Sequence, residues 1–253
     1  MPNLFTTIGF NVRQSVDFIR LMQEATAEGE TLNARHGYYV RWSPGAGAEL
    51  WVLVNTEREV IGCLPHFAGG ATMPVRVHRL LPERGRPLQG KLDGWAGPDG
   101  DDATSGRFSL LVDLPDFDLV RRRLRPPVAV DLQIAAFAND LSCYRNTHEF
   151  CELKKQDPHL AVEAFLPTGM FAGASAEDGG ATEAAITGTI LAAELRTNPY
   201  GQQGFWAVQL QTCGGTVDVV ADPLVVSGEP RAGGVAAGTF WLSGRIRGDQ
   251  GGR

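Results

Sequence analysis

Residues 186–221 read ITGTILAAELRTNPYGQQGFWAVQLQTCGGTVDVVA, and this stretch decides the fold that the sequence predicts. Its apolar residues fall into three runs that are typical of β-strands, with turn signals between them at Asn198–Gly201 and at Gly214-Gly215. A fourth run of the same character follows at Gly238–Ile246. Several short strands without a helix between them favour a small closed or partly closed β-barrel over residues 184–247.

The chain before this stretch mixes helix and strand signals. Apolar residues recur at three- and four-residue spacing over 16–28, which predicts a helix, and a loosely alternating run at 4–12 predicts a strand before it. Three strand-like runs follow, at Tyr38–Trp42, Glu49–Asn55 and Glu59–Phe67. The chain is therefore expected to open in the order β-α-β-β-β.

We accordingly predict an α+β fold, in which a β-rich mixed N-terminal region at residues 1–171 precedes the small barrel. The N-terminal region forms one module, or two modules that divide near residues 70–85, because Gly69-Gly70 interrupts the strand signals. The small and acidic residues 172–183 are the expected linker, and residues 248–253 are the expected disordered tail.

Charge and hydropathy argue against several classes of partner. The net charge is −6, and residues 1–85, 86–172 and 173–253 carry 8, 10 and 5 basic residues against 8, 13 and 8 acidic ones. Nucleic-acid-binding proteins gain much of their affinity by neutralising phosphates, so we do not expect a nucleic-acid partner. The uncharged stretches are too short to span a membrane, the start lacks a secretory pattern, and the four cysteines form no Cys-x-x-Cys pair. We therefore predict a cytoplasmic protein without a membrane partner.

Three segments resemble a set of uncharacterised bacterial proteins that end in an OB-like barrel: FLPTGMF at 165–171, DVVADP at 218–223 and GTFWLSGRI at 238–246. This resemblance implies an OB-like barrel at the end of the chain and no particular activity. The β-α-β-β-β opening resembles one module of the vicinal-oxygen-chelate (glyoxalase-like) fold, whose members commonly carry metal ligands on the first and last strands of a module. In this chain His66 stands near the end of the last strand of the opening, whereas the first strand offers Thr6, Thr7 and Asn11.

Two histidines and a carboxylate of the N-terminal region are candidate metal ligands. His66, His78 and Glu49 fall on or beside different predicted strands, and imidazoles and a carboxylate from different strands can form a facial metal site. Beyond a divalent metal ion at these residues, no cofactor is predicted.

Two Phe-Trp pairs, Phe205-Trp206 and Phe240-Trp241, stand on strands of the predicted barrel. Adjacent strand residues point to opposite faces, so each pair sends one ring into the barrel and the other outward. Outward rings cover another domain or stack on bases or sugars. Together with Arg245, these four aromatic residues form the candidate ligand or interface surface.

The catalytic motifs that the sequence approaches are all incomplete. Gly85–Lys91 fits GxxxxGK, but Leu92 stands where a phosphate loop needs Ser or Thr. His148–Glu152 begins like the zinc motif HExxH and ends in Glu instead of His. The sequence contains neither GxSxG nor GxGxxG. Whether the protein is an enzyme is left open by the sequence.

The leading hypothesis is a non-catalytic binding or assembly protein that uses the cleft between its two regions. Its partner would be another protein or a small molecule, and a homo-oligomer is compatible with this hypothesis. Two alternatives remain: a metal-dependent enzyme with a glyoxalase-like N-terminal half, and single-stranded nucleic-acid binding by the barrel, against which the acidic charge argues.

Overall fold

The computed structural model describes residues 3–100, 105–153, 161–168 and 180–248. Strands make up 54% of these residues and helical residues 15%, so the fold is β-rich, and the prediction of an α+β fold is wrong. Two of the three described α-helices are only seven residues long, whereas the longest strand has 17 residues.

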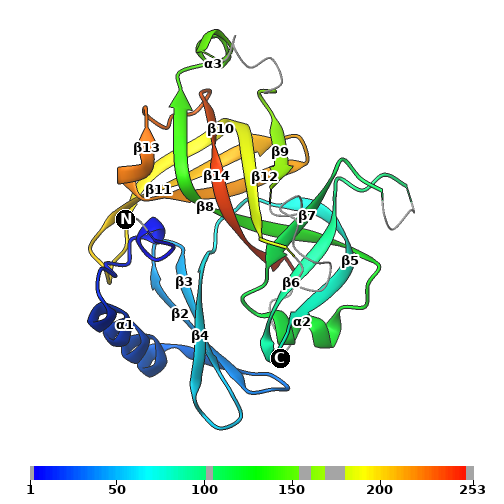
Figure 1. Ribbon diagram of the computed structural model, residues 1–253. Helices are drawn as coiled ribbons and strands as arrows, with labels where there is room; N and C mark the ends of the chain where they lie inside the picture. Colours follow the sequence, from blue (N-terminus) through cyan, green and yellow to red (C-terminus); the bar gives the residue numbers. More distant parts are fainter. Residues whose placement is uncertain (1–2, 101–104, 154–160, 169–179, 249–253) are drawn as a thin grey trace.

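The first part of the chain forms a four-stranded antiparallel sheet, covered on one face by a helix (Figure 1). The strand order in this sheet is β1-β2-β3-β4. Its elements are η1 (Thr6–Ile8), α1 (Ser15–Glu28), β1 (Glu30–Asn33), β2 (Tyr38–Gly45), β3 (Ala48–Val54) and β4 (Val60–Phe67).

Eight of the remaining described strands form two rings that share one long antiparallel pair, β8 (Val128–Tyr144) and β14 (Val235–Ile246). We call ring A the ring that β8 and β14 complete with β5 (Met73–Glu83), β6 (Arg86–Ala96) and β7 (Phe108–Asp113). Ring B is the ring that they complete with β10 (Glu183–Thr197), β11 (Gly204–Thr212) and β12 (Gly215–Ala221).

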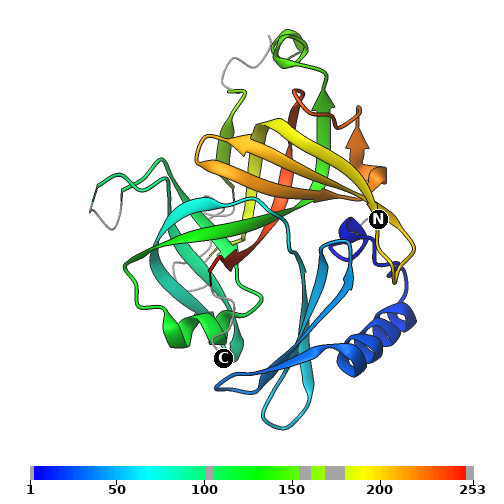
Figure 2. The same ribbon diagram turned by 180° about the vertical axis from the view of Figure 1, so that it is seen from behind.

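Each shared strand contributes one half to each ring. In β8, residues 128–132 pair with β5 of ring A, and residues 135–137 pair with β12 of ring B. In β14, residues 235–241 pair with β10, and Ser243 pairs with β7. Figures 1 and 2 show β8 and β14 running from one ring into the other.

Five short elements complete the described fold. They are α2 (Phe117–Arg123), α3 (Thr147–Leu153), β9 (Ala164–Pro167), η2 (Pro223–Val225) and β13 (Val226–Ser227). Strand β9 lies at the free edge of β10, and β13 pairs with the end of β8. Helix α2 packs against β6, with Phe117 and Val120 in the core of the rings. Among the residues described, no helix combines the length and the apolar character that crossing a membrane needs.

Alternation along the strands separates three apolar clusters. One cluster fills both rings and includes Ile134 and Ala136 of β8. Ala135 and Phe137, which alternate with these residues along β8, face a second cluster between ring B, α1 and the four-stranded sheet. Every residue of β3 is buried, because one face of this strand joins the second cluster and the other, through Trp51, packs towards β6 and α2.

Several sequence-based elements are confirmed, and one is not. The structure has α1 and the strands β2, β3 and β4 where helical spacing and the strand-like runs predict them. The predicted strand at 4–12 is instead the short helix η1 followed by an irregular segment, because Gly9 adopts a φ of 76° and turns the chain. Most of the predicted linker 172–183 and of the predicted tail 248–253 lies outside the described residues.

Candidate functional site

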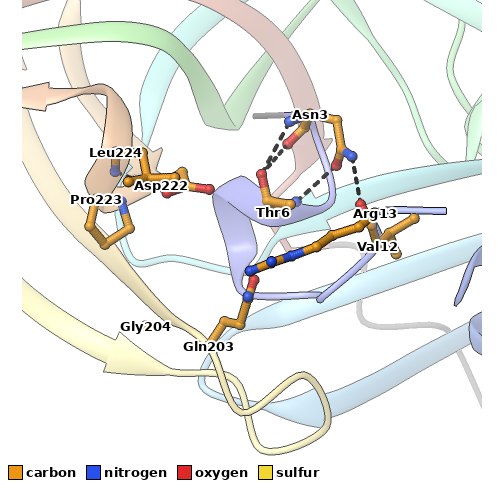
Figure 3. Close-up of a pocket in the computed structure, with 9 residues that line it drawn as sticks. All are labelled: Asn3, Thr6, Val12, Arg13, Gln203, Gly204, Asp222, Pro223 and Leu224. Carbon is orange, nitrogen blue, oxygen red and sulfur yellow. Dashed lines mark hydrogen bonds between the residues drawn. The ribbon is translucent and has the colours of Figure 1, made fainter. Parts of the chain in front are cut away.

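A pocket of about 570 Å³ lies where the N-terminal segment meets ring B (Figure 3). The N-terminal segment lines it with four residues, and the strand β11 and the turn before β13 supply the other side. The lining residues are Asn3, Thr6, Val12, Arg13, Gln203, Gly204, Asp222, Pro223 and Leu224.

The turn between β10 and β11 holds the N-terminal segment in place. The Asn198 side chain is fully buried, and its Nδ2 donates a hydrogen bond to the carbonyl oxygen of Ile8 at 2.8 Å. Gly201 approaches the carbonyl oxygen of Gly9 so closely that a Cβ atom would lie 2.0 Å from it. Phe10 then packs against Tyr200. The two walls of the pocket are therefore held together by contacts outside it.

Two of the polar side chains lining the pocket form hydrogen bonds with backbone groups of the N-terminal segment. The Asn3 Oδ1 accepts hydrogen bonds from the N–H groups of Phe5 and Thr6, and its Nδ2 donates to the carbonyl oxygen of Val12 at 2.9 Å. The Thr6 hydroxyl donates to the carbonyl oxygen of Asn3 at 3.0 Å. These contacts fix the shape of the N-terminal wall and leave its amide and hydroxyl groups engaged.

Two charged residues of the pocket retain free hydrogen-bonding capacity. Within the described residues, the guanidinium of Arg13 has no hydrogen-bond or ion-pair partner, although the Arg13 backbone N–H donates to Asp17 at 3.0 Å. The Asp222 Oδ1 accepts one hydrogen bond, from the N–H of Leu224 at 3.0 Å, and no partner of its Oδ2 is described. Figure 3 shows the Arg13 side chain extending across the pocket from one wall and the Asp222 carboxylate entering from the other.

The rim of the pocket is apolar. Leu224 is 86% exposed, the most exposed large hydrophobic side chain among the described residues. Val12 and Pro223 add further apolar surface on the two sides. The pocket therefore combines one cation, one anion and a small apolar surface.

A second polar site lies buried between β3, β4, β8 and β14. The Glu49 side chain is 1% exposed, and it accepts hydrogen bonds from Arg41 and from Trp51 Nε1 at 3.1 Å. Arg245 stacks over the Trp51 ring, 4.8 Å from its centroid, and its Nη1 lies 3.6 Å from Glu49 Oε2. Burial acts to raise the pKa of Glu49, but the neighbouring His66, the hydrogen bond from Arg41 and the charge of Arg245 hold this pKa below its ordinary value.

His66 pairs with Glu49 across β3 and β4 and begins a chain of hydrogen bonds. Its Nδ1 lies 2.8 Å from the Ser243 hydroxyl, and its Nε2 lies 2.9 Å from Gln133 Oε1. The Gln133 Nε2 donates to Asp218 Oδ2 at 2.9 Å. Burial lowers the pKa of His66 to about 4, and burial raises the pKa of Asp218.

The directions of these hydrogen bonds follow from the Gln133 amide. Its Nε2 also donates to the carbonyl oxygen of Phe67 at 3.1 Å, so its Oε1 faces His66 and accepts from an Nε2–H. The neutral imidazole then carries no proton at Nδ1, which accepts the hydroxyl proton of Ser243. A serine bonded to an oriented histidine is the arrangement of an activated nucleophile.

The surroundings of Ser243 and His66 give this pair a different role. Both residues are 0% exposed. The adjacent cavity, lined by His66, Gln133, Arg245 and Arg247 among others, has a volume of about 60 Å³, room for roughly two water molecules. A substrate does not fit there, so the network acts as a polar link between β4, β8 and β14.

The structure brings together two of the three predicted metal ligands. Glu49 and His66 are neighbours, but the direct contacts described above link them to other protein groups. His78 lies in β5 at an irregularity in its pairing with β6. The described parts of the chain contain no group of three or more His, Cys, Asp or Glu residues placed to hold a metal ion. The metal site on these three residues stays a prediction.

The four predicted aromatic residues divide between two apolar clusters. Phe240 is buried in the core cluster of the rings, and Trp206 packs against this cluster. Phe205 and Trp241 lie on the other side, at the cluster that ring B shares with the four-stranded sheet. The Trp241 Nε1 donates a hydrogen bond to Asp113 Oδ2 at 2.8 Å. Each pair thus sends its two rings to opposite faces of the strand.

Comparison with protein-family models, with curated proteins and with solved structures finds no match to this chain. The two family resemblances drawn from the sequence therefore stay predictions. Sequence reasoning did not identify Arg13 or Asp222 as site residues. Asp222-Pro223 carries a turn signal, but nothing in the local pattern places this turn beside the segment that contains Arg13.

Proposed function

We propose that this protein is a non-catalytic binding protein and that its site is the pocket between the N-terminal segment and ring B. The observation that supports it best is the Arg13 guanidinium, which lines this pocket without a protein partner among the described residues. Arg13 is exposed, so its five N–H donors are open to a bound acceptor in place of water. The volume of about 570 Å³ lies in the range of small-molecule sites.

The chemistry of the lining favours binding over catalysis. Arg13 and Asp222 are the two titratable residues among the nine that line the pocket, and an arginine stays protonated at any ordinary pH. The hydroxyl of Thr6 donates to a backbone carbonyl, and no histidine, cysteine or lysine among the lining residues is present to activate it. Such a set of residues orients a ligand by charge and hydrogen bonds.

The position of the pocket suits a ligand that contacts two parts of the chain. Its walls come from the N-terminal segment and from ring B, which is the arrangement expected of a binding cleft between two parts of a chain. A ligand bound there would contact both walls and add to the contacts that Asn198 already makes with Ile8. Ligand binding is therefore expected to raise the melting temperature of the full chain.

The test is a thermal-shift screen of the full chain with amino acids, short peptides, sugars, nucleotides and carboxylic acids. Compounds that raise the melting temperature are then titrated by calorimetry into wild-type protein, Leu224→Trp and Leu195→Trp. The indole at position 224 fills the rim of the pocket, whereas Leu195 is a 56% exposed leucine on β10 outside it.

We expect at least a tenfold loss of affinity in Leu224→Trp and wild-type affinity in Leu195→Trp. Equal affinity in both variants would place the binding elsewhere and overturn the proposal. The absence of any binder among these classes would overturn it as well.

A further inference from the structure

The charges of the same pocket point to the chemical class of its ligand, and this inference rests on the proposed function. The site presents one free cationic group and one carboxylate with an oxygen to spare, and these groups enter from opposite walls (Figure 3). We infer that the ligand is a zwitterion with an aliphatic side chain, either a free amino acid or a short peptide.

The Arg13 guanidinium defines the anionic end of the ligand. Its donors form a planar fork that matches a carboxylate through two parallel hydrogen bonds. Because no described protein group occupies these donors, a ligand carboxylate replaces only water there. A ligand without an anion leaves the guanidinium unmatched.

Asp222 defines the cationic end. A carboxylate only accepts hydrogen bonds, and one of its oxygens is already used by the N–H of Leu224. Its other oxygen suits an ammonium group, which brings both donors and the opposite charge. A ligand that is only anionic would meet repulsion from Asp222, and one that is only cationic would meet repulsion from Arg13.

The apolar rim selects the rest of the ligand. Val12 lies beside Arg13, and Pro223 and Leu224 lie beside Asp222, so each charge has aliphatic surface next to it. Burying the strongly exposed Leu224 side chain against an aliphatic group removes apolar surface of both from water. Sugars and nucleotides lack such a group, whereas leucine and leucine-containing peptides carry it.

Four probes separate these contributions: L-leucine, Leu-Leu-Leu, N-acetyl-leucine and leucinamide. Acetylation removes the cation of leucine, and amidation removes its anion, with the side chain unchanged. Each probe is titrated by calorimetry into wild-type protein, Arg13→Gln and Asp222→Asn. Neither substitution removes a described contact within the protein. The Arg13 guanidinium has no described partner, and the amide oxygen introduced by Asp222→Asn can still accept the hydrogen bond from the Leu224 N–H.

We expect leucine or the tripeptide to bind the wild-type protein and both charge-deleted analogues to bind at least tenfold more weakly. In Arg13→Gln, leucine and leucinamide should bind equally, because the partner of the carboxylate is gone. In Asp222→Asn, leucine and N-acetyl-leucine should bind equally. Arg84→Gln, at an exposed arginine in the turn between β5 and β6, should bind all probes as the wild-type protein does.

The length of the ligand decides between its two sources. Tighter binding of leucine indicates a free amino acid, and tighter binding of Leu-Leu-Leu, whose charges lie farther apart, indicates a peptide.

Two results would overturn the inference. One is that neither zwitterion binds; the other is that the analogues lose no affinity. If other compounds of the screen nevertheless lose affinity in Leu224→Trp, the pocket is a binding site for a different ligand class, and only this inference fails.

Discussion

Replacing the buried His66 by Gln should flatten the loss of stability that the protein undergoes on mild acidification. His66 is 0% exposed, both of its ring nitrogens are hydrogen-bonded, and burial lowers its pKa to about 4 from 6.5. The native state therefore keeps a neutral imidazole under conditions in which the unfolded chain takes up a proton.

The sign and size of the effect follow from this pKa shift. Above pH 6.5 neither state is protonated, and the contribution of His66 to stability is fully present. Between pH 6.5 and 4 the unfolded chain binds one proton more than the native state, so the free energy of unfolding falls by about 1.4 kcal/mol per pH unit. The full window amounts to roughly 3 kcal/mol, and below pH 4 the loss levels off.

Buried carboxylates shift this profile in the opposite direction near its acidic end. Burial raises the pKa of Asp113 and of Asp218, so the native state takes up these protons before the unfolded chain does. Because the variant keeps both carboxylates, their contribution is common to both proteins, and the difference between the wild-type and His66→Gln profiles reports the imidazole together with its coupling to Glu49.

The assay is urea denaturation followed by tryptophan fluorescence at pH values from 7.5 to 4.5. His148→Gln serves as the control, because His148 is exposed on α3. We expect the wild-type protein and His148→Gln to lose stability in parallel below pH 6.5 and His66→Gln to lose clearly less. Parallel profiles for all three proteins would refute the reasoning and show that His66 is protonated in the native state.

Two further pairs of variants test the packing of the rings against the four-stranded sheet. Tyr39→Phe removes a buried hydroxyl that donates to a backbone carbonyl of β6 at 2.6 Å and accepts from the N–H of Asp118 at 2.9 Å. It should lower the free energy of unfolding by about 1–3 kcal/mol, whereas the control Tyr38→Phe should change this free energy little. Equal urea midpoints for the two variants would contradict these contacts. Gly69→Ala would place a Cβ 2.1–2.5 Å from the carboxylate of Asp218, and it should lower the free energy of unfolding by about 1–3 kcal/mol. The Cβ of Gly70→Ala meets nothing within 4 Å, so this variant should be nearly neutral. Melting temperatures that fall equally in the two variants would show that the structure around Gly69 adjusts to the added methyl group.

The local pattern of apolar residues was sufficient to predict several helices and strands. Helical spacing identified α1, and strand-like apolar runs identified β2 and β3. Strand β8 runs from Val128 to Tyr144, and local propensity does not reveal that its two halves pair with different rings.

The candidate site depends on contacts that are distant in sequence. Asn198 was identified as part of a turn, and it does lie at the turn between β10 and β11, but its hydrogen bond to Ile8 spans 190 residues. His66 and Glu49 were singled out as an imidazole and a carboxylate on different strands, and a metal ion was the partner that these residue types suggested. Their observed partners include Ser243, which is 177 residues from His66. Such pairings follow from the register of the whole fold and leave no local signature.

The strand pair shared by the two rings has a consequence for how the chain acquires its structure. Ring A contains β5 to β7 from the first half of the chain, yet it closes only when β14 has been added alongside β8. During synthesis on the ribosome, both rings therefore stay open until the last strand emerges, with the edges of β8 and β10 exposed to other nascent chains. Folding is expected to be slow and all-or-none, and truncation before β14 would disrupt both rings at once.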